Sequence, residues 1–180
     1  MQTKGRIFLS NLTEEHIARY ISQSTDSELI ETMGWKPFHD GEKDRFLQTA
    51  EIPTVPYCKN GEAITLSIIS AIDKKAIGYL SIKGINRVAA CAEIGIAIMD
   101  KKYRGRGYGT EALQKAIDHA CDEFGITVLL LTVFPSNKKA IRCYEKAGFS
   151  KKELLKDSWL LPSGKYSDMW LMELRHTIAL

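Results

Sequence analysis

The sequence is poor in the residues that build metal sites and disulfide frameworks. Its 180 residues include only four cysteines and four histidines, and both kinds are scattered along the chain. No two cysteines stand at the spacing of a metal-ligand pair, so no metal site is expected. Cys91 and Cys121 lie inside apolar patterns, which favours reduced thiols in a reducing compartment.

The sequence also lacks a strong net charge and any long apolar run. Its net charge of +3 is too small to indicate a nucleic-acid partner. No apolar run approaches the roughly 20 residues that cross a bilayer, and residues 1–12 lack the apolar core and cleavage site of a secretory signal. We therefore expect a cytoplasmic protein with no nucleic-acid or membrane partner. Its length and the absence of repeats or linkers predict a single domain over residues 1–180.

Two common nucleotide-binding motifs are missing as well. Gly105, Gly107 and Gly109 give the pattern G-x-G-x-G, whereas the dinucleotide-binding fingerprint needs G-x-G-x-x-G. A P-loop needs a lysine before its Ser or Thr, and the residues just before Thr110 include none.

What the sequence does have is an organised stretch over residues 93–110. Isoleucines at 94, 96 and 98 alternate with Gly95, Ala97 and Met99, a period of two that predicts a strand. Arg104 and Arg106 interleave the glycines, and apolar residues at helical spacing run from Tyr108 to Phe124, where Gly125 predicts the helix end. A helix start with free N–H groups, glycines and basic side chains predicts a site for a phosphate or diphosphate. A tight glycine turn with solvated charges is the alternative.

The remaining segments predict a mixed, mostly antiparallel sheet. We expect a strand at 6–11, a helix capped by Thr13, a helix at 26–33 ended by Gly34, and a short helix at 40–50. Strands follow from residue 62, with one ending at Met99, then a buried strand at 126–134, a short helix capped by Ser136 or Asn137, and a hairpin at 150–174. Residues 35–61 are either a substrate lid or a plain connecting loop.

The glycine stretch resembles a known family signature. Arg104-Gly105-Arg106-Gly107-Tyr108-Gly109 resembles the R/Q-x-x-G-x-G/A motif of the GCN5-related N-acetyltransferases, the GNAT superfamily. Asn137 and the segment from Ala140 to Phe149, which resembles A-x-x-x-Y-E-K-x-G-F, add to the match over residues 62–174. The resemblance implies an α/β (α+β) GNAT fold: six or seven strands, splayed between strands 4 and 5 and flanked by about four helices.

The resemblance also implies a cosubstrate, acetyl-CoA, and the residues that hold it. The pantetheine arm would contact backbone groups of Ile98 and Met99, and Asn137 would reach its side. The diphosphate would lie on Arg104, Gly105, Arg106, Gly107, Tyr108, Gly109 and Thr110.

Two residues are candidates for the chemistry of acetyl transfer. An alkylamine has a pKa of about 10.4, so a base must take its proton. Glu93, at the head of the strand, is the candidate base, and a solvent-facing or ion-paired strand residue is the alternative. Tyr144 is the candidate proton donor to the leaving thiolate and would lie near the cosubstrate sulfur; a core tyrosine is the alternative.

The amine acceptor is left open by the sequence. Gly164-Lys165-Tyr166-Ser167-Asp168 resembles a turn of the branches that acetylate ribosomal-protein N-terminal alanines and polyamines. We therefore expect an N-acetyltransferase, monomeric or homodimeric, acting on a protein N-terminus or a polyamine-like amine. Antibiotic or amino-acid acetylation, and a non-catalytic acyl-CoA-binding domain, are the alternatives. The early acidic residues Glu28, Glu31, Asp40, Glu42 and Asp44 form either a cation-attracting patch or a solvated face.

Overall fold

A computed structural model describes residues 5–55, 58 and 61–176. These residues form one seven-stranded sheet in the order β1-β2-β3-β4-β5-β7-β6. The strands are β1 (Ile7–Asn11), β2 (Glu62–Ser70), β3 (Ala76–Asn86), β4 (Cys91–Ile98), β5 (Val128–Val133), β6 (Ser150–Leu160) and β7 (Tyr166–Arg175). The helices are α1 (Glu14–Gln23), α2 (Ser27–Met33), α3 (Lys43–Glu51), α4 (Tyr108–Phe124) and α5 (Lys138–Lys146), with a short 3₁₀ helix, η2 (Lys101–Tyr103).

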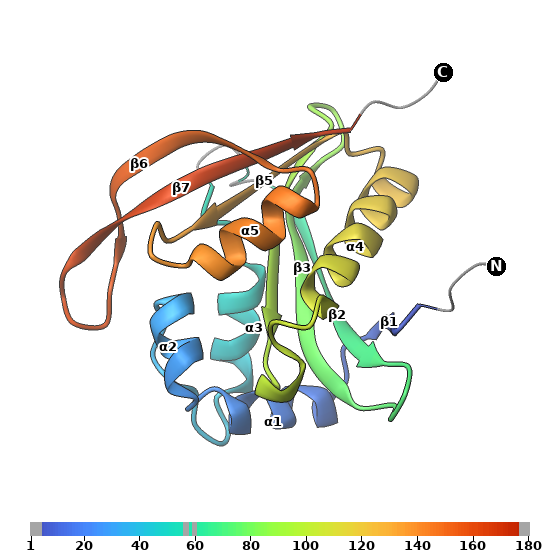
Figure 1. The fold of residues 1–180 in the computed structure, drawn as a ribbon, viewed down its shortest axis with the longest axis vertical. Coiled ribbons are helices and arrows are strands. Elements are labelled where there is room, and N and C mark those ends of the chain that lie inside the picture. The colour runs from blue at the N-terminus through green and yellow to red at the C-terminus, as the bar shows by residue number, and fades with distance from the viewer. Residues whose placement is uncertain (1–4, 56–57, 59–60, 177–180) are drawn as a thin grey trace.

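The two faces of the sheet bury different helices. Because side chains alternate along a strand, Leu80 of β3 packs in the core beneath α4 and α5, while its neighbour Tyr79 packs against α1 and α3. Alternation on β4 likewise puts Ile94 in the first core and Ala97 in the second. Figure 1 shows α4 and α5 lying across the sheet, and the turn end of the β6–β7 hairpin projecting to the left past α2.

The sheet opens between its two parallel strands. β4 and β5 pair only from Cys91 with Val128 to Glu93 with Leu130. Beyond that point β4 continues to Ile98 on β3, while β5 continues to Val133 on β7. The backbone of residues 94–98 therefore has no strand partner on its β5 side, and this opening positions the candidate site.

The fold class predicted from the sequence is confirmed, including the splay between strands 4 and 5. Thr13 caps α1 through a hydrogen bond from the His16 amide, and Gly34 and Gly125 end their helices in the left-handed region. Two details differ. The described residues hold five α-helices rather than about four, and β5 is shorter than the predicted 126–134. The shortening has a local cause, since Ile126 and Thr127 bond to Ala120 and Ala90 before the ladder begins.

None of the helices in the described ranges combines the length and the apolar composition that crossing a bilayer requires.

Candidate active site

The glycine loop leaves the start of α4 open. Gly107 occupies the N-cap position at φ 83° and Gly105 has φ 70°, conformations that glycine adopts without the strain of a side chain. No side chain caps this end of the helix, so the N–H groups of its first turn are free to bind an anion. The partial positive charge of a 17-residue helix adds to that preference.

Arg6 holds the loop from outside. Its guanidinium donates to the Arg106 carbonyl at 2.9 Å, lies 4.6 Å from the centre of the Tyr108 ring, and pairs with Glu111 at 3.1 Å. Arg106 itself is exposed, and Tyr108 is buried under Arg6. Arg6, just before β1, and the first turn of α4 therefore fix the loop conformation before any ligand arrives.

A cleft of about 450 Å³ runs from this loop along the open edge of β4. Of the residues that the sequence assigned to cosubstrate binding, those lining the cleft are Ile98, Arg104, Gly105, Gly107, Gly109, Thr110, Asn137 and Tyr144. Met99, Arg106 and Tyr108 do not line it. The Met99 side chain faces the α1–α3 core instead, because it follows Ile98 on the opposite face of the strand.

The Arg104 side chain is committed to protein contacts. Its guanidinium pairs with Asp26 at 2.8 Å and with Glu28 at 3.2 Å, and it donates to the carbonyls of Ile98 and Met99. The hydrogen bond from Arg104 lowers the pKa of Asp26. Arg104 thus ties the end of β4 to α2, and a role in holding a diphosphate through its side chain stays a prediction.

Helix α5 adds a basic edge that the sequence analysis missed. Lys139, Arg142 and Lys146 all line the cleft. Their spacing of three and four residues puts them on one side of the helix, and that spacing was the available signal. Lys139 pairs with Glu28 at 2.8 Å, and Glu28 also lines the cleft. Arg142 and Lys146 therefore supply the positive charge that, with the open start of α4, suits a multiply charged anion at this end of the cleft.

Asn137 and Tyr144 lie where the cleft meets a second cavity. Asn137 caps α5 by accepting a hydrogen bond from the Ala140 amide, and its amide group donates to the Thr32 carbonyl at 3.5 Å. Tyr144 is half-buried, packs against Phe149, and lines both cavities. Burial raises the pKa of the Tyr144 hydroxyl, which therefore keeps its proton.

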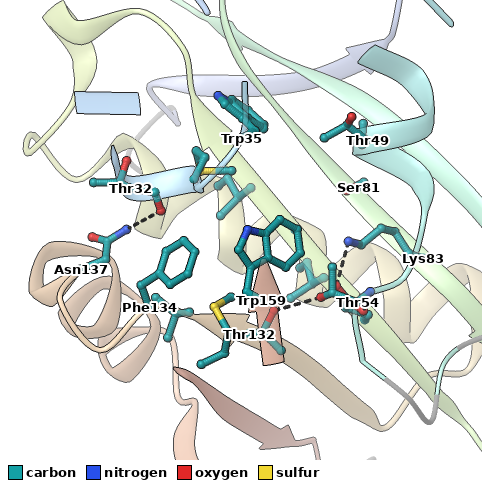
Figure 2. Close-up of a pocket in the computed structure, with 18 of the residues that line it drawn as sticks. Thr32, Trp35, Thr49, Thr54, Ser81, Lys83, Thr132, Phe134, Asn137 and Trp159 are labelled. Carbon is teal, nitrogen blue, oxygen red and sulfur yellow. Dashed lines mark hydrogen bonds and ion pairs between the residues drawn. The ribbon is translucent and has the colours of Figure 1, made fainter. Parts of the chain in front are cut away.

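The second cavity consists of two adjacent pockets that share several lining residues. The inner pocket, about 120 Å³, reaches from Tyr144 to Glu93, and the outer pocket, about 560 Å³, opens between α3 and β6. Both are lined by Trp35, Thr49, Thr54, Thr132, Trp159 and Met169. Figure 2 shows the Trp159 indole between Phe134 on one side and Thr54 with Lys83 on the other. Residues 35–54 therefore supply walls of these pockets.

Glu93 lies in the inner pocket as a buried, fully engaged carboxylate. Its side chain and that of Lys83 are 3% and 7% exposed, and they pair at 2.7 Å. Thr54 donates to it from its amide and its hydroxyl, and Val55 donates from its amide, all within 2.7 Å. Each carboxylate oxygen thus has two donors. The Thr54 hydroxyl also bonds to the Thr132 hydroxyl at 2.9 Å, which extends the network into both pockets.

Comparison with known proteins agrees with this geometry. A family model described as an acetyltransferase (GNAT) domain matches residues 6–150. The chain is 42% identical over 69 residues to the uncharacterized N-acetyltransferase MJ1207 of Methanocaldococcus jannaschii, covering 38% of this chain and 30% of that protein. It is 33% identical over 94 residues to the spermidine N(1)-acetyltransferase of Escherichia coli, covering 52% and 50% respectively. The chain thus spans half or less of the length of these two relatives.

A solved structure shows the same fold over nearly the whole chain. The spermidine N-acetyltransferase from Vibrio cholerae, solved in complex with CoA and spermine, superposes with a TM-score of 0.77. It covers 95% of this chain and 96% of that one at 19% identity. A likeness at this identity establishes the fold, and the family match over residues 6–150 establishes the kinship. The chain belongs to the GNAT acetyltransferase family, whose cosubstrate is acetyl-CoA.

Proposed function

We propose that the chain is an acetyl-CoA-dependent N-acetyltransferase that transfers an acetyl group directly to a primary amine. One observation carries the proposal: the cleft at the β4–β5 opening runs from the uncapped start of α4 to Tyr144, and Tyr144 also lines the inner pocket. A diphosphate at the helix start and a thioester at Tyr144 fit the two ends of this cleft. The names of the relatives support an amine as the acceptor.

The chemical change is simple to balance. The bound cosubstrate supplies an activated acyl carbon; a C–N bond forms to the neutral amine, the C–S bond breaks, and the proton that the nitrogen then loses balances the proton gained by the thiolate. An acceptor that arrives as an ammonium ion loses one further proton, which is released to solvent. The protein must therefore take one proton near the amine and provide one near the sulfur. Glu93 and Tyr144 are the residues predicted for these tasks, and both line the inner pocket.

The proton route to Glu93 runs through two hydroxyls in our proposal. The two carboxylate oxygens of Glu93 already accept from four donors. If Thr132 and Thr54 relay the proton, the amine's proton can reach Glu93 through them without displacing any of these donors. A carboxylate only accepts, so the Thr54 hydroxyl donates to Glu93 and the Thr132 hydroxyl donates to Thr54. A proton that enters at Thr132 can then leave Thr54 for the Glu93 carboxylate.

Removal of the Thr132 hydroxyl tests this route. Thr132→Val keeps the shape of the side chain and should lower kcat about tenfold at pH 7. The loss should shrink towards pH 10, where more of the amine arrives unprotonated. Thr132→Ser keeps a hydroxyl and should stay near wild-type activity. Equal pH–rate profiles for the valine and serine variants would contradict the relay.

Tyr144→Phe should lower kcat about a hundredfold while the Kd for acetyl-CoA changes less than about twofold. The raised pKa of Tyr144 keeps its hydroxyl protonated at neutral pH, so the loss should be the same from pH 6 to pH 9. Tyr166→Phe is the matched control, because Tyr166 is exposed and lines none of the three cavities. An unchanged kcat in Tyr144→Phe would remove its role at the sulfur.

The proposed function itself is tested by free-thiol release from acetyl-CoA with a panel of amines, N-terminal peptides and aminoglycosides. Amine-dependent thiol release with a matching acetylated product is the expected result. Tight acetyl-CoA binding with no acetylated product from any acceptor would instead identify a non-catalytic acyl-CoA-binding domain.

A further inference from the structure

The acceptor pockets contain almost no negative charge. Glu93 is the single carboxylate among the described residues that line the inner and outer pockets, and Lys83 neutralises it at 2.7 Å. The residues outside the described ranges include no aspartate or glutamate. The pockets therefore offer no free carboxylate to a second or third ammonium group of an acceptor.

The acidic residues of the early segment do not fill this gap. Glu28 pairs with Lys139 and Arg104, and Glu42 pairs with Arg45. Glu31, Asp40 and Asp44 are exposed and line neither pocket. These carboxylates form ion pairs or a solvated face, which was one of the two alternatives left open by the sequence.

Aromatic and aliphatic side chains, together with neutral hydroxyl groups, form most of the pocket walls instead. The Trp159 indole donates to the Gly34 carbonyl at 3.0 Å, and its ring lies edge-on to Phe134 with the centroids 6.4 Å apart. The Trp35 and Phe38 rings meet edge to face, and Phe38 in turn packs edge to face against Phe46. Packing holds both indoles in place, and a hydrogen bond also fixes that of Trp159, so the two rings form preformed surfaces for a flat apolar group.

The outer pocket is basic at its edge. Lys36 and Arg45 both line it. The Arg45 guanidinium pairs with Glu42 and donates hydrogen bonds to the carbonyls of Lys36 and Pro37. Lys36 is exposed, and no ion pair to its ammonium group occurs among the described residues. An anionic group at the far end of an acceptor would meet this charge, whereas a second ammonium group would be repelled by it.

We propose that the acceptor is a monoamine on a flat apolar body with a carboxylate at its far end, and that polyamines are poor substrates. The inference rests on the proposed acetyl transfer. The amino group enters the inner pocket between Tyr144 and Thr132, the apolar body lies along Trp35 and Trp159, and the carboxylate reaches Lys36. Charge complementarity selects this class over spermidine.

Three acceptors that differ in charge test the proposal. The probes are 4-(2-aminoethyl)benzoate, 2-phenylethylamine without the carboxylate, and spermidine, each assayed for kcat/KM by thiol release. We expect the benzoate to be the best substrate and spermidine the poorest. Lys36→Glu should lower kcat/KM for the benzoate about fivefold, raise it about fivefold for spermidine, and leave 2-phenylethylamine within about twofold.

Lys115→Glu is the matched control, because it makes the same charge change on α4 and Lys115 lines neither pocket. All three kcat/KM values should stay at the wild-type level in this variant. A wild-type preference for spermidine, or an equal effect of Lys36→Glu on the two aromatic amines, would overturn the inference and leave the proposed function standing. Absence of any acetylated product from all three amines and from the wider panel would overturn both.

Discussion

Replacement of Lys83 by methionine should lower the free energy of unfolding by about 3–5 kcal/mol. Lys83 and Glu93 are both almost completely buried and pair at 2.7 Å. Loss of the ammonium group leaves a buried carboxylate whose charge has no counter-charge, which costs more than the pair contributes. Lys83 also donates to the Ile52 carbonyl, and Glu93 accepts from the Thr54 and Val55 amides, so the pair fastens residues 52–55 to the sheet. Urea unfolding followed by circular dichroism measures the change.

Two further variants separate the buried pair from a general effect of losing a lysine. Lys75→Met removes an exposed lysine that lies 3.9 Å from Asp73, and it should change stability little. Lys83→Met combined with Glu93→Gln removes both buried charges but keeps an acceptor oxygen for the Thr54 and Val55 amides, and it should recover most of the lost stability. A loss below about 1 kcal/mol in Lys83→Met alone would show that the pair does not hold this segment in place.

Gly107→Ala should weaken acetyl-CoA binding at least tenfold, whereas Gly125→Ala should leave it unchanged. The two glycines cap opposite ends of α4, both in the left-handed region, at φ 83° and 66°. A side chain at either position costs roughly 1–2 kcal/mol of backbone strain. Gly107 alone lines the cleft, where its conformation aims the free N–H groups of the first helical turn. Its added methyl group would also press on the Arg6 guanidinium at 3.1 Å, which is the contact that holds the loop.

Comparison of the two variants separates an effect on acetyl-CoA binding from an effect on the stability of the fold. Thermal melts should show a similar loss of stability in both, and calorimetric titration should show a loss of affinity only in Gly107→Ala. Equal acetyl-CoA affinities in the two variants would contradict the placement of the diphosphate at the start of α4.

Local signals made much of the fold and of the cosubstrate site predictable from sequence. The Thr13 cap, the helix ends at Gly34 and Gly125, and the alternation of Ile94, Ile96 and Ile98 each depend on a few neighbouring residues. The glycine loop and the start of α4 are likewise contiguous. These local patterns, together with the family signature, were enough to predict the fold class.

The acceptor pockets were not predictable, because they join residues far apart in the sequence. Trp159 bonds to Gly34 across 125 positions, and Thr54 bonds to Thr132 across 78. The Arg104 side chain was assigned to a diphosphate from its place in the motif, yet it bonds to Asp26 and Glu28 of α2. An ion-paired strand residue was the alternative for Glu93, and its partner proves to be Lys83, which lies opposite it on β3. Such pairings depend on strand register and loop packing, which single-residue patterns do not encode.

Calorimetric titration of acetyl-CoA into the full chain tests the central claim most directly. We predict saturable binding of one acetyl-CoA per chain, reduced by added salt because Arg142 and Lys146 meet phosphate charge at the cleft. The absence of binding, or binding that Gly107→Ala leaves unchanged, would contradict a CoA site between β4, β5 and the start of α4.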